Sequence, residues 1–215
     1  MSSVGLHEST GKQEGTSVNS YLIALFIHVF SVVGLFAAIG VTVTCLTAAQ
    51  HVRDALVVRV LTRMAEIADM AIPPVALVAL FSGLYMVWRA SAWTDGWIVV
   101  SLVQFAVAFA LGPTVNGRRL ARLSRVAKTC HQGAIPARLS RALKDPILTI
   151  GERTMTGMTV GVVYLMVMKP SAAGSVIALA IFSIVGFACA LPAIANARTP
   201  LPVAPEQQVP WREEV

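Results

Sequence analysis

Residues 21–46 read YLIALFIHVFSVVGLFAAIGVTVTCL and contain no charged side chain. At 1.5 Å per residue, a helix of this length crosses the roughly 30 Å of hydrocarbon in a bilayer. The stretch is also longer than the apolar core of a cleavable signal peptide, so we expect it to remain in the protein. It therefore predicts an integral membrane protein whose first transmembrane helix begins near Tyr21.

Further apolar stretches follow and predict more membrane-spanning helices. The fourth span is interrupted in its first half by Glu152 and Arg153, and charged residues are costly inside a membrane. A bundle of four crossings, in which this stretch only re-enters the membrane, is the alternative. We predict an all-α, five-helix transmembrane bundle over residues 20–196, with spans at about 21–46, 70–88, 97–115, 147–168 and 174–195.

The two ends of the chain are polar. Residues 1–19 are rich in Ser, Gly and Thr and predict a disordered N-terminal segment. Residues 197–215 contain four prolines and predict a disordered tail. Inside the bundle, the sequence WTDG at 93–96 predicts a short turn, so that the second and third helices form a tight hairpin.

The positive charges are distributed unevenly along the chain. The net charge is +6, but the basic residues lie between apolar spans rather than on one soluble domain, which argues against a nucleic-acid partner. With five spans, fourteen of the seventeen Lys and Arg residues fall on one side of the membrane. The positive-inside rule then places the N-terminus outside and the C-terminus in the cytoplasm.

Most of these charges lie in a predicted cytoplasmic loop at 117–145. Arg118, Arg122 and Arg125 recur at helical spacing, with leucines between them. This pattern predicts a helix at the membrane surface, attracted to anionic lipid headgroups. A binding surface for an acidic partner is the alternative.

His28 is the histidine that lies inside a predicted span, and an ionisable residue there is a candidate functional site. It is a possible ligand of haem b or copper, although a haem held by two helix histidines needs a second intramembrane histidine. The alternative is a hydrogen bond from His28 to a neighbouring helix.

A second group of ionisable residues lies near one membrane boundary. Their spacing on the second helix and their depth at the start of the fourth predict an ion-pair network between helices, with a gated polar pathway as the alternative. This predicted network consists of Arg63, Glu66, Asp69, Glu152 and Arg153.

Small and amide side chains inside the spans predict close helix packing. Gly157 and Gly161 form a GxxxG motif, and Gly34 and Gly40 give the first helix a small-residue face. Gln104, in the middle of the third span, predicts a hydrogen bond between helices. The chain contains no phosphate-binding glycine loop and no HExxH motif, so we expect a protein without catalytic activity.

Three stretches resemble a group of small bacterial predicted integral membrane proteins of unknown function. They are YLIALFIHVFSVVGLFAAIG from Tyr21, PPVALVALFSGLYMVWRASAWTDGWIVVSL from Pro73 and TGMTVGVVYLMVMKP from Thr156. The resemblance implies a multi-pass protein of the bacterial plasma (inner) membrane. A looser similarity to copper-resistance-type and protoporphyrinogen-oxidase-type membrane proteins rests on His28. Those proteins carry a Trp-Gly-Gly pattern after the histidine, where this chain reads VVGLFAAIG.

These observations lead to three hypotheses of function. The first is a non-catalytic accessory subunit that packs in the bilayer against a membrane protein partner or a second copy of itself. The second is a haem- or copper-associated redox or transport protein that uses His28. The third is a small-solute transporter that uses the carboxylates of Glu66, Asp69 and Glu152.

Overall fold

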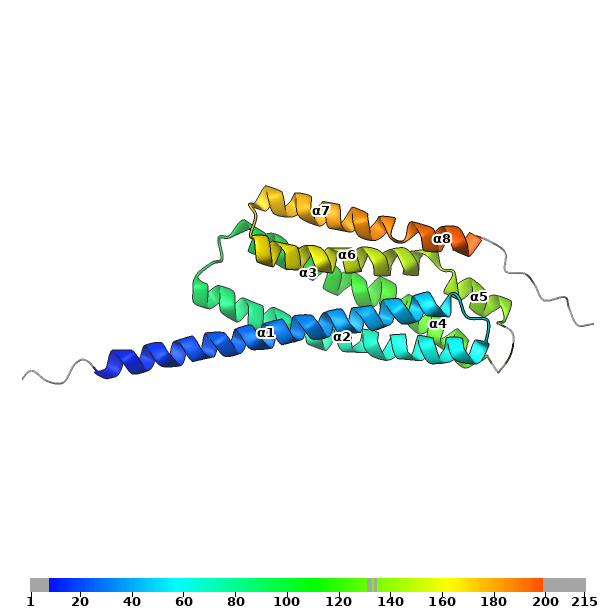
Figure 1. Cartoon of the computed structure of the whole chain (residues 1–215), viewed down its shortest axis with the longest axis horizontal. Coiled ribbons are helices and arrows are strands. Elements are labelled where there is room, and N and C mark those ends of the chain that lie inside the picture. The colour runs from blue at the N-terminus through cyan, green and yellow to red at the C-terminus, as the bar shows by residue number, and fades with distance from the viewer. Residues whose placement is uncertain (1–7, 131–132, 134, 199–215) are drawn as a thin grey trace, which may run out of the picture.

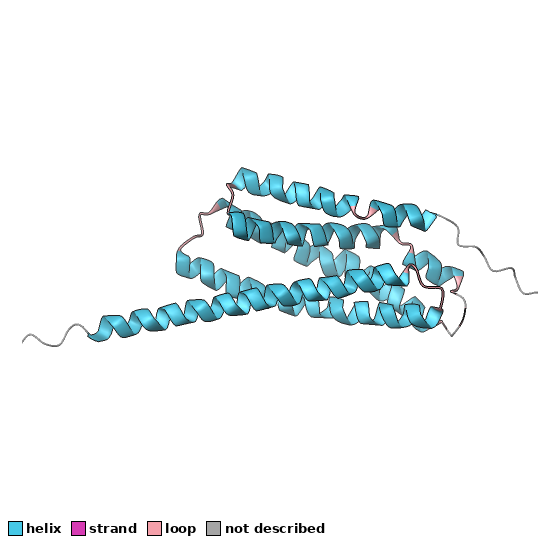
Figure 2. Cartoon of the chain, viewed as in Figure 1, coloured by secondary structure: helices cyan, strands magenta, loops and turns pink. Residues whose placement is uncertain are grey.

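The computed structural model describes residues 8–130, 133 and 135–198, and all its regular elements in this part of the chain are helices (Figure 2). In chain order they are α1 (Glu8–Ala49), α2 (Ala55–Ala90), α3 (Gly96–Leu111), the π-helical segment η1 (Gly112–Gly117), α4 (Arg118–Lys128), α5 (Ala137–Leu143), α6 (Pro146–Met168), α7 (Ala172–Ala188) and α8 (Leu191–Arg198).

The helices form two groups that lie side by side (Figure 1). Helix α1 packs along α2, and α4 also packs on α2; in the other group α6 packs along α7, and α3 contacts both. The chain passes from one group to the other where α3 continues through η1 into α4. We call the end of the bundle formed by α4, α5, the α1–α2 connection and the start of α6 the basic end.

Local signals in the sequence explain where several helices begin and end. The side chains of Asp54 and Asp145 accept hydrogen bonds from the backbone N–H groups of Leu56 and Ile147, at 2.8 and 3.0 Å. These contacts satisfy N–H groups that the first turn of a helix leaves unpaired. At the far ends of α2 and α6, Ser91 and Lys169 adopt the left-handed conformation that commonly terminates helices.

Four stretches of helix are long and apolar enough to cross a membrane. They are Asn19–Ala49, Ala55–Ala90, Gly96–Lys128 and Ala172–Ala195. Helix α6, the predicted fourth span, has 23 residues but carries Glu152 and Arg153 and is not among these four.

The structure corrects the predicted start of the second span. Helix α2 begins at Ala55 rather than near residue 70, so most of the segment expected to be a loop is helical. Pro73 and Pro74 therefore lie in the middle of α2 and not near its start. The reason is that residues 55–69 bury one face: Val58, Thr62 and Ala65 are buried against the rest of the basic end, and tertiary packing of this kind stabilises a helix.

The predicted basic loop at 117–145 is also largely helical. Helix α4 continues the direction of the third span, and its apolar face packs inside the protein, where Leu120 and Leu123 are almost completely buried. The leucines of this segment therefore pack against other helices of the protein, and the attraction of its arginines to anionic headgroups stays a prediction. The arginines at 118, 122 and 125 lie on the exposed face of α4.

The second and third helices do not form a packed hairpin. Their connection is short, as predicted, from Ser91 to Asp95. However, α3 packs against α6 and α7, whereas α2 packs against α1 and α4. A short connection limits the distance between two helix ends, but it does not determine which neighbour each helix contacts along its length.

The helical region also extends beyond the predicted boundaries at both ends. Helix α1 begins at Glu8, so residues 8–19, which were predicted to be disordered, continue the first transmembrane helix; residues 1–7 lie outside the described part. Adding residues to an existing helix costs less free energy than nucleating a new helix. Near the other end, α7 stops at Ala188 and a turn leads into α8. Of the predicted C-terminal tail, residues 199–215 are outside the described residues.

The main hydrophobic core lies at the basic end. Residues from α1, α2, α4, α5 and α6 meet there, and the cluster consists of Cys45, Leu46, Ala49, Val58, Ala65, Leu120, Leu123, Ala127, Leu139, Leu143 and Leu148. A smaller cluster around Leu165 joins α6 to α7. Most other large apolar side chains on α1, α3 and α7 are exposed on the outside of the bundle, as expected for helices whose neighbour is lipid.

Candidate functional site

Polar side chains gather on the inner side of the basic end and connect the helices there. Glu66 on α2 is the centre of one set. Its Oε2 atom accepts hydrogen bonds from Arg63 Nη1 at 2.8 Å and from Ser124 Oγ at 2.8 Å, and Lys128 Nζ lies 3.4 Å away. Because Ser124 and Lys128 belong to α4, this carboxylate attaches α4 to α2.

A second ion pair attaches α4 to α6. Arg119 Nη1 lies 2.5 Å from Oδ2 of Asp145, whose other oxygen caps the start of α6. Neither this pair nor Ser124 was predicted from the sequence. The order Asp145-Pro146 before an apolar stretch is a recognisable helix-start signal and would have identified Asp145 as a capping residue. No comparable signal distinguishes Ser124.

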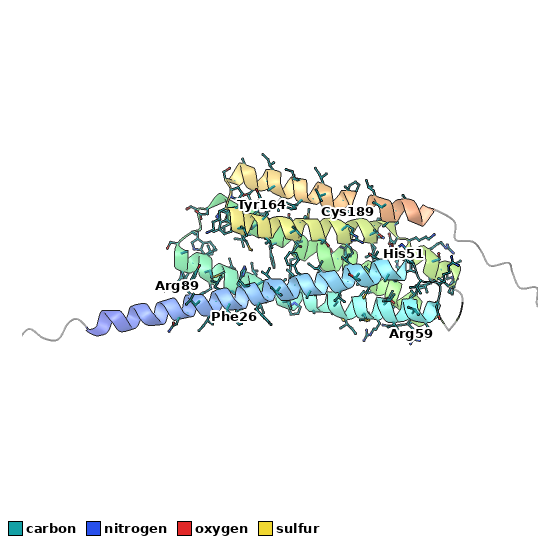
Figure 3. The ribbon with its side chains drawn as sticks, in the orientation of Figure 1. Phe26, His51, Arg59, Arg89, Tyr164 and Cys189 are labelled. Carbon is teal, nitrogen blue, oxygen red and sulfur yellow. The ribbon has the colours of Figure 1, made fainter. Side chains whose placement is uncertain are left out.

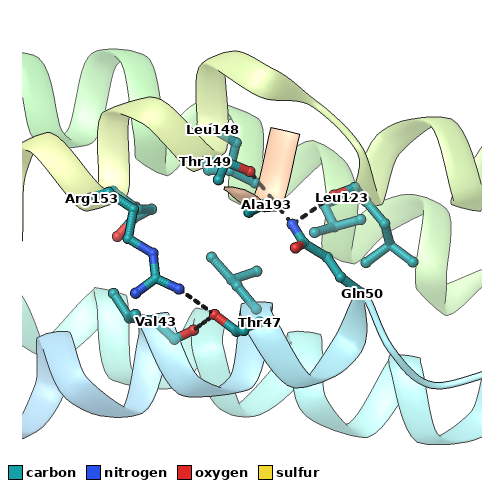
Figure 4. Close-up of a pocket in the computed structure, with 11 residues that line it drawn as sticks. Val43, Thr47, Gln50, Leu123, Leu148, Thr149, Arg153 and Ala193 are labelled. Carbon is teal, nitrogen blue, oxygen red and sulfur yellow. Dashed lines mark hydrogen bonds between the residues drawn. The ribbon is translucent and has the colours of Figure 1, made fainter. Parts of the chain in front are cut away.

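Arg153 connects α6 to α1. Its Nη2 atom donates to Thr47 Oγ1 at 2.7 Å, and one turn away Gln50 Nε2 contacts Thr149 Oγ1 at 3.4 Å and Leu143 O at 3.2 Å (Figure 4). These contacts border a small open recess between α1, α4, α6 and α8, to which Glu152 also contributes. The recess has room for about one water molecule, so in this conformation it does not accommodate a larger solute.

Asp69 and Glu152 differ from the rest of the predicted network. Neither carboxylate makes a hydrogen bond or ion pair with another side chain among the described residues. The two groups lie on α2 and α6 and are close enough to repel each other, and the positive charge of Arg153 offsets part of this repulsion at Glu152. The predicted five-residue network is therefore divided: Arg63 with Glu66 forms one part and Arg153 with Thr47 another, and the two remaining carboxylates form no ion pair among the described residues.

The π-helical segment η1 lies beside these two carboxylates. Asn116 is only 5% exposed, and its side-chain amide lies directly against the Cα atom of Gly151, where a Cβ atom would overlap Asn116 Oδ1. A Cβ atom at Gly117 would lie 3.6 Å from Asp69 Oδ2. Short π-helical segments occur often at functional sites. Asn116 was not among the residues predicted from the sequence.

His28 lies between α1 and α2, far from this cluster along the chain. Its Nδ1 atom is 2.8 Å from Ala79 O, and the ring rests on Gly83, where a Cβ atom would come within 3.1 Å of Cε1. With the proton on Nδ1, Nε2 keeps its lone pair, which is the form that binds metals. No group of three or more His, Cys, Asp or Glu residues within the described ranges is arranged to hold a metal ion.

The predicted packing residues occupy different environments. Gly157 and Gly161 lie on the face of α6 that touches α7, and Gly34 lies next to Val75 of α2. Gly40 differs, because a Cβ atom there would meet no atom within 4 Å. The amide nitrogen of Gln104 is buried without a hydrogen-bond partner in the described part of the chain.

Comparison with known proteins places the chain in a family without assigning it an activity. No curated protein matches the sequence, and no solved structure matches it either. One family model, described as "Predicted integral membrane protein (DUF2269)", matches residues 22–170, which is more than half of the chain. The match covers α2, α3, α4 and α6 and most of α1, and so includes all the site residues described above. The chain therefore belongs to the DUF2269 family of predicted integral membrane proteins.

Proposed function

We propose that the protein crosses the bacterial plasma membrane five times, with α6 as the fourth crossing. In support, α6 starts at the basic end, where Arg119 pairs with Asp145, and finishes at the opposite end. There, Lys169 Nζ lies 6.0 Å from the centre of the Trp97 ring, at the start of α3. A helix of 23 residues is about 34 Å long, which is enough to span the hydrocarbon layer.

The proposed orientation has the basic end in the cytoplasm and the N-terminus outside. Arg59 lies at the basic end and Arg89 at the opposite end (Figure 3), and the arginines of α4 are concentrated at the first of these. The exposed face of α4 with Arg118, Arg122 and Arg125 would then contact anionic headgroups of the inner leaflet.

Labelling of single cysteines tests this topology. In a chain without its native cysteines, we expect a membrane-impermeant maleimide to label Asp95→Cys and Ala173→Cys in intact cells. Thr129→Cys should react only after the membrane is permeabilised. Ala173 lies in the first turn of α7, just after the short connection from α6, so its reaction reports whether α6 crosses. Labelling of Ala173→Cys from the cytoplasmic side alone would contradict a crossing by α6.

We further propose that the protein is a non-catalytic accessory subunit whose helix α1 binds another transmembrane helix. The observation that carries this proposal is the exposed small-residue face formed by Ala37, Gly40 and Thr44. No atom of the described residues lies within 4 Å of a Cβ atom at Gly40, although small residues at this spacing allow a second helix to approach closely in a membrane. The partner helix belongs to another membrane protein or to a second copy of this chain.

Cross-linking from α1 tests the accessory role. A photoreactive residue in place of Ala37 should give an adduct of discrete size in native membranes, whereas the same residue at Phe26, which is also exposed on α1, should not. The substitution Gly40→Leu should abolish the adduct by blocking close approach, without lowering the thermal stability of the purified protein. Equal adducts from both positions, or an adduct that survives Gly40→Leu, would refute the proposal.

Two alternative functions rest on other parts of the structure. Haem b or copper binding at His28 is favoured by the Nδ1 contact with Ala79, which leaves Nε2 available, but His28 supplies a single ligand atom. A small-solute transporter would use Asp69 and Glu152, since Glu66 is already engaged by α4. The recess that Glu152 borders would have to widen for that role.

A further inference from the structure

The carboxylates of Asp69 and Glu152 form no ion pair or side-chain hydrogen bond within the described chain, and their negative charges repel each other. Glu66, only three residues before Asp69, receives two cationic side chains and a hydroxyl group. Asp69 and Glu152 receive none, although seventeen Lys and Arg residues are present in the sequence. Like charges that face each other disfavour the doubly ionised state unless a positive charge compensates them.

Asn116 provides an independent sign that something binds between α2, η1 and α6. An amide side chain has one acceptor and two donor hydrogens, and a buried amide normally uses them. Asn116 is 95% buried, as its 5% exposure shows, yet its side chain makes no hydrogen bond with the described residues. Its amide lies on Gly151, the residue directly before Glu152.

Glycines allow the backbones of α6 and η1 to lie close to the side chains of Asn116 and Asp69. Gly151 has no side chain to displace the Asn116 amide, and Gly117 leaves space beside Asp69 Oδ2. The π-helical turns at Gly112–Gly117 lie in the same segment, and such turns change which side chains point inward compared with a regular α-helix. Asp69 Oδ2 thus lies beside Gly117, and the Asn116 amide lies against Gly151, so residues next to one another in η1 and α6 bring Asp69, Asn116 and Glu152 into the same part of the bundle.

We propose that Asp69, Glu152 and the Asn116 amide oxygen form a binding site for a small divalent cation of the magnesium type. Carboxylate and amide oxygens are the ligands of hard cations, and Mg²⁺ is typically bound by one or two carboxylates while it keeps several of its waters. Even when Arg153 is counted, two ionised carboxylates leave a net negative charge here, and the guanidinium of Arg153 is directed to Thr47.

The consequence is a structural role for the cation at the junction of the two helix groups. Asp69 belongs to the α1–α2 group and Glu152 to the α3–α6–α7 group. A cation between them turns the repulsion of the two carboxylates into an attraction. The cation thus stabilises the association of the two groups near the membrane boundary.

Thermal unfolding of the full-length protein in mild detergent, after treatment with a chelator, tests the site. We expect MgCl₂ to raise the melting temperature saturably, by roughly 5 °C at a hundredfold excess over the dissociation constant. NaCl at equal ionic strength should not do so. Asp69→Asn and Glu152→Gln should each abolish the saturable rise. The control Glu66→Gln, which removes a carboxylate already paired with α4, should keep it.

Isothermal titration calorimetry of the wild-type protein with MgCl₂ makes the test independent of the variants. One magnesium ion per chain is the expected stoichiometry. In Asn116→Ala, the dissociation constant for magnesium should be at least tenfold higher. The absence of saturable binding would overturn the proposal, as would an equal response in Asp69→Asn and the wild type.

Discussion

Replacing Leu120 by alanine is expected to lower the free energy of unfolding by about 2–5 kcal/mol. Leu120 is 1% exposed and lies in the core at the basic end, where helices from both groups meet. Its removal costs the transfer free energy of the lost methyl and methylene groups and leaves a cavity that the neighbouring helices fill only in part. Thermal or SDS-induced unfolding of the detergent-solubilised protein measures the effect.

Leu22→Ala is the matched control for this experiment. Leu22 is 54% exposed on α1 and faces lipid or detergent before and after unfolding, so we expect a change of about 0.5 kcal/mol or less. Similar losses for the two substitutions would mean that the basic end does not hold the bundle together.

Replacing Gly157 by alanine is expected to destabilise the protein by roughly 1–3 kcal/mol, because α6 and α7 would be forced apart. A Cβ atom at this position would overlap the carbonyl oxygen of Phe182 and lie 3.0 Å from the Cα atom of Gly186. Both are backbone atoms of α7 and cannot rotate away as a side chain does. The same unfolding measurement, combined with cross-linking between α6 and α7, reports the change.

Gly40→Ala provides the control, since it makes the same chemical change in a transmembrane helix with nothing nearby. We expect it to be neutral or to stabilise the protein by up to about 1 kcal/mol, the difference in helix propensity between alanine and glycine. If Gly157→Ala were as well tolerated as Gly40→Ala, the close contact of α6 with α7 would not contribute to stability.

The positions of the apolar helices could be predicted from the sequence because hydrophobicity is a local property. Residues 21–46 contain no charge and were expected to span a membrane; they lie within α1, whose stretch Asn19–Ala49 meets the requirements for a span. The start of α2 at Ala55 was not foreseen, because Arg53, Arg59 and Arg63 made this segment resemble a polar loop. Its helical conformation depends on Val58 and Ala65 being buried against α4 and other parts of the basic end.

The candidate site was foreseen only in part for a similar reason. Arg63 and Glu66 are three residues apart on one helix, so their ion pair could be predicted from spacing alone. The partners Ser124, Thr47 and Asn116 come from other helices, and no pattern within a single helix indicates them. The predicted network also treated Asp69 and Glu152 as members of ion pairs, whereas neither forms one among the described residues.

The sequence by itself determined that this is an all-helical membrane protein, because the length and apolarity of its helices follow from neighbouring residues. It also determined that positive charge is concentrated at one end, because most Lys and Arg residues lie in the segments that alternate apolar spans bring to the same side. Only the tertiary structure decided that α3 packs with α6 and α7 instead of α2, that the leucines of α4 face inward, and that Gly157 is enclosed while Gly40 is open. These features depend on contacts between residues far apart in the chain, where helices of similar apolarity compete for the same partners.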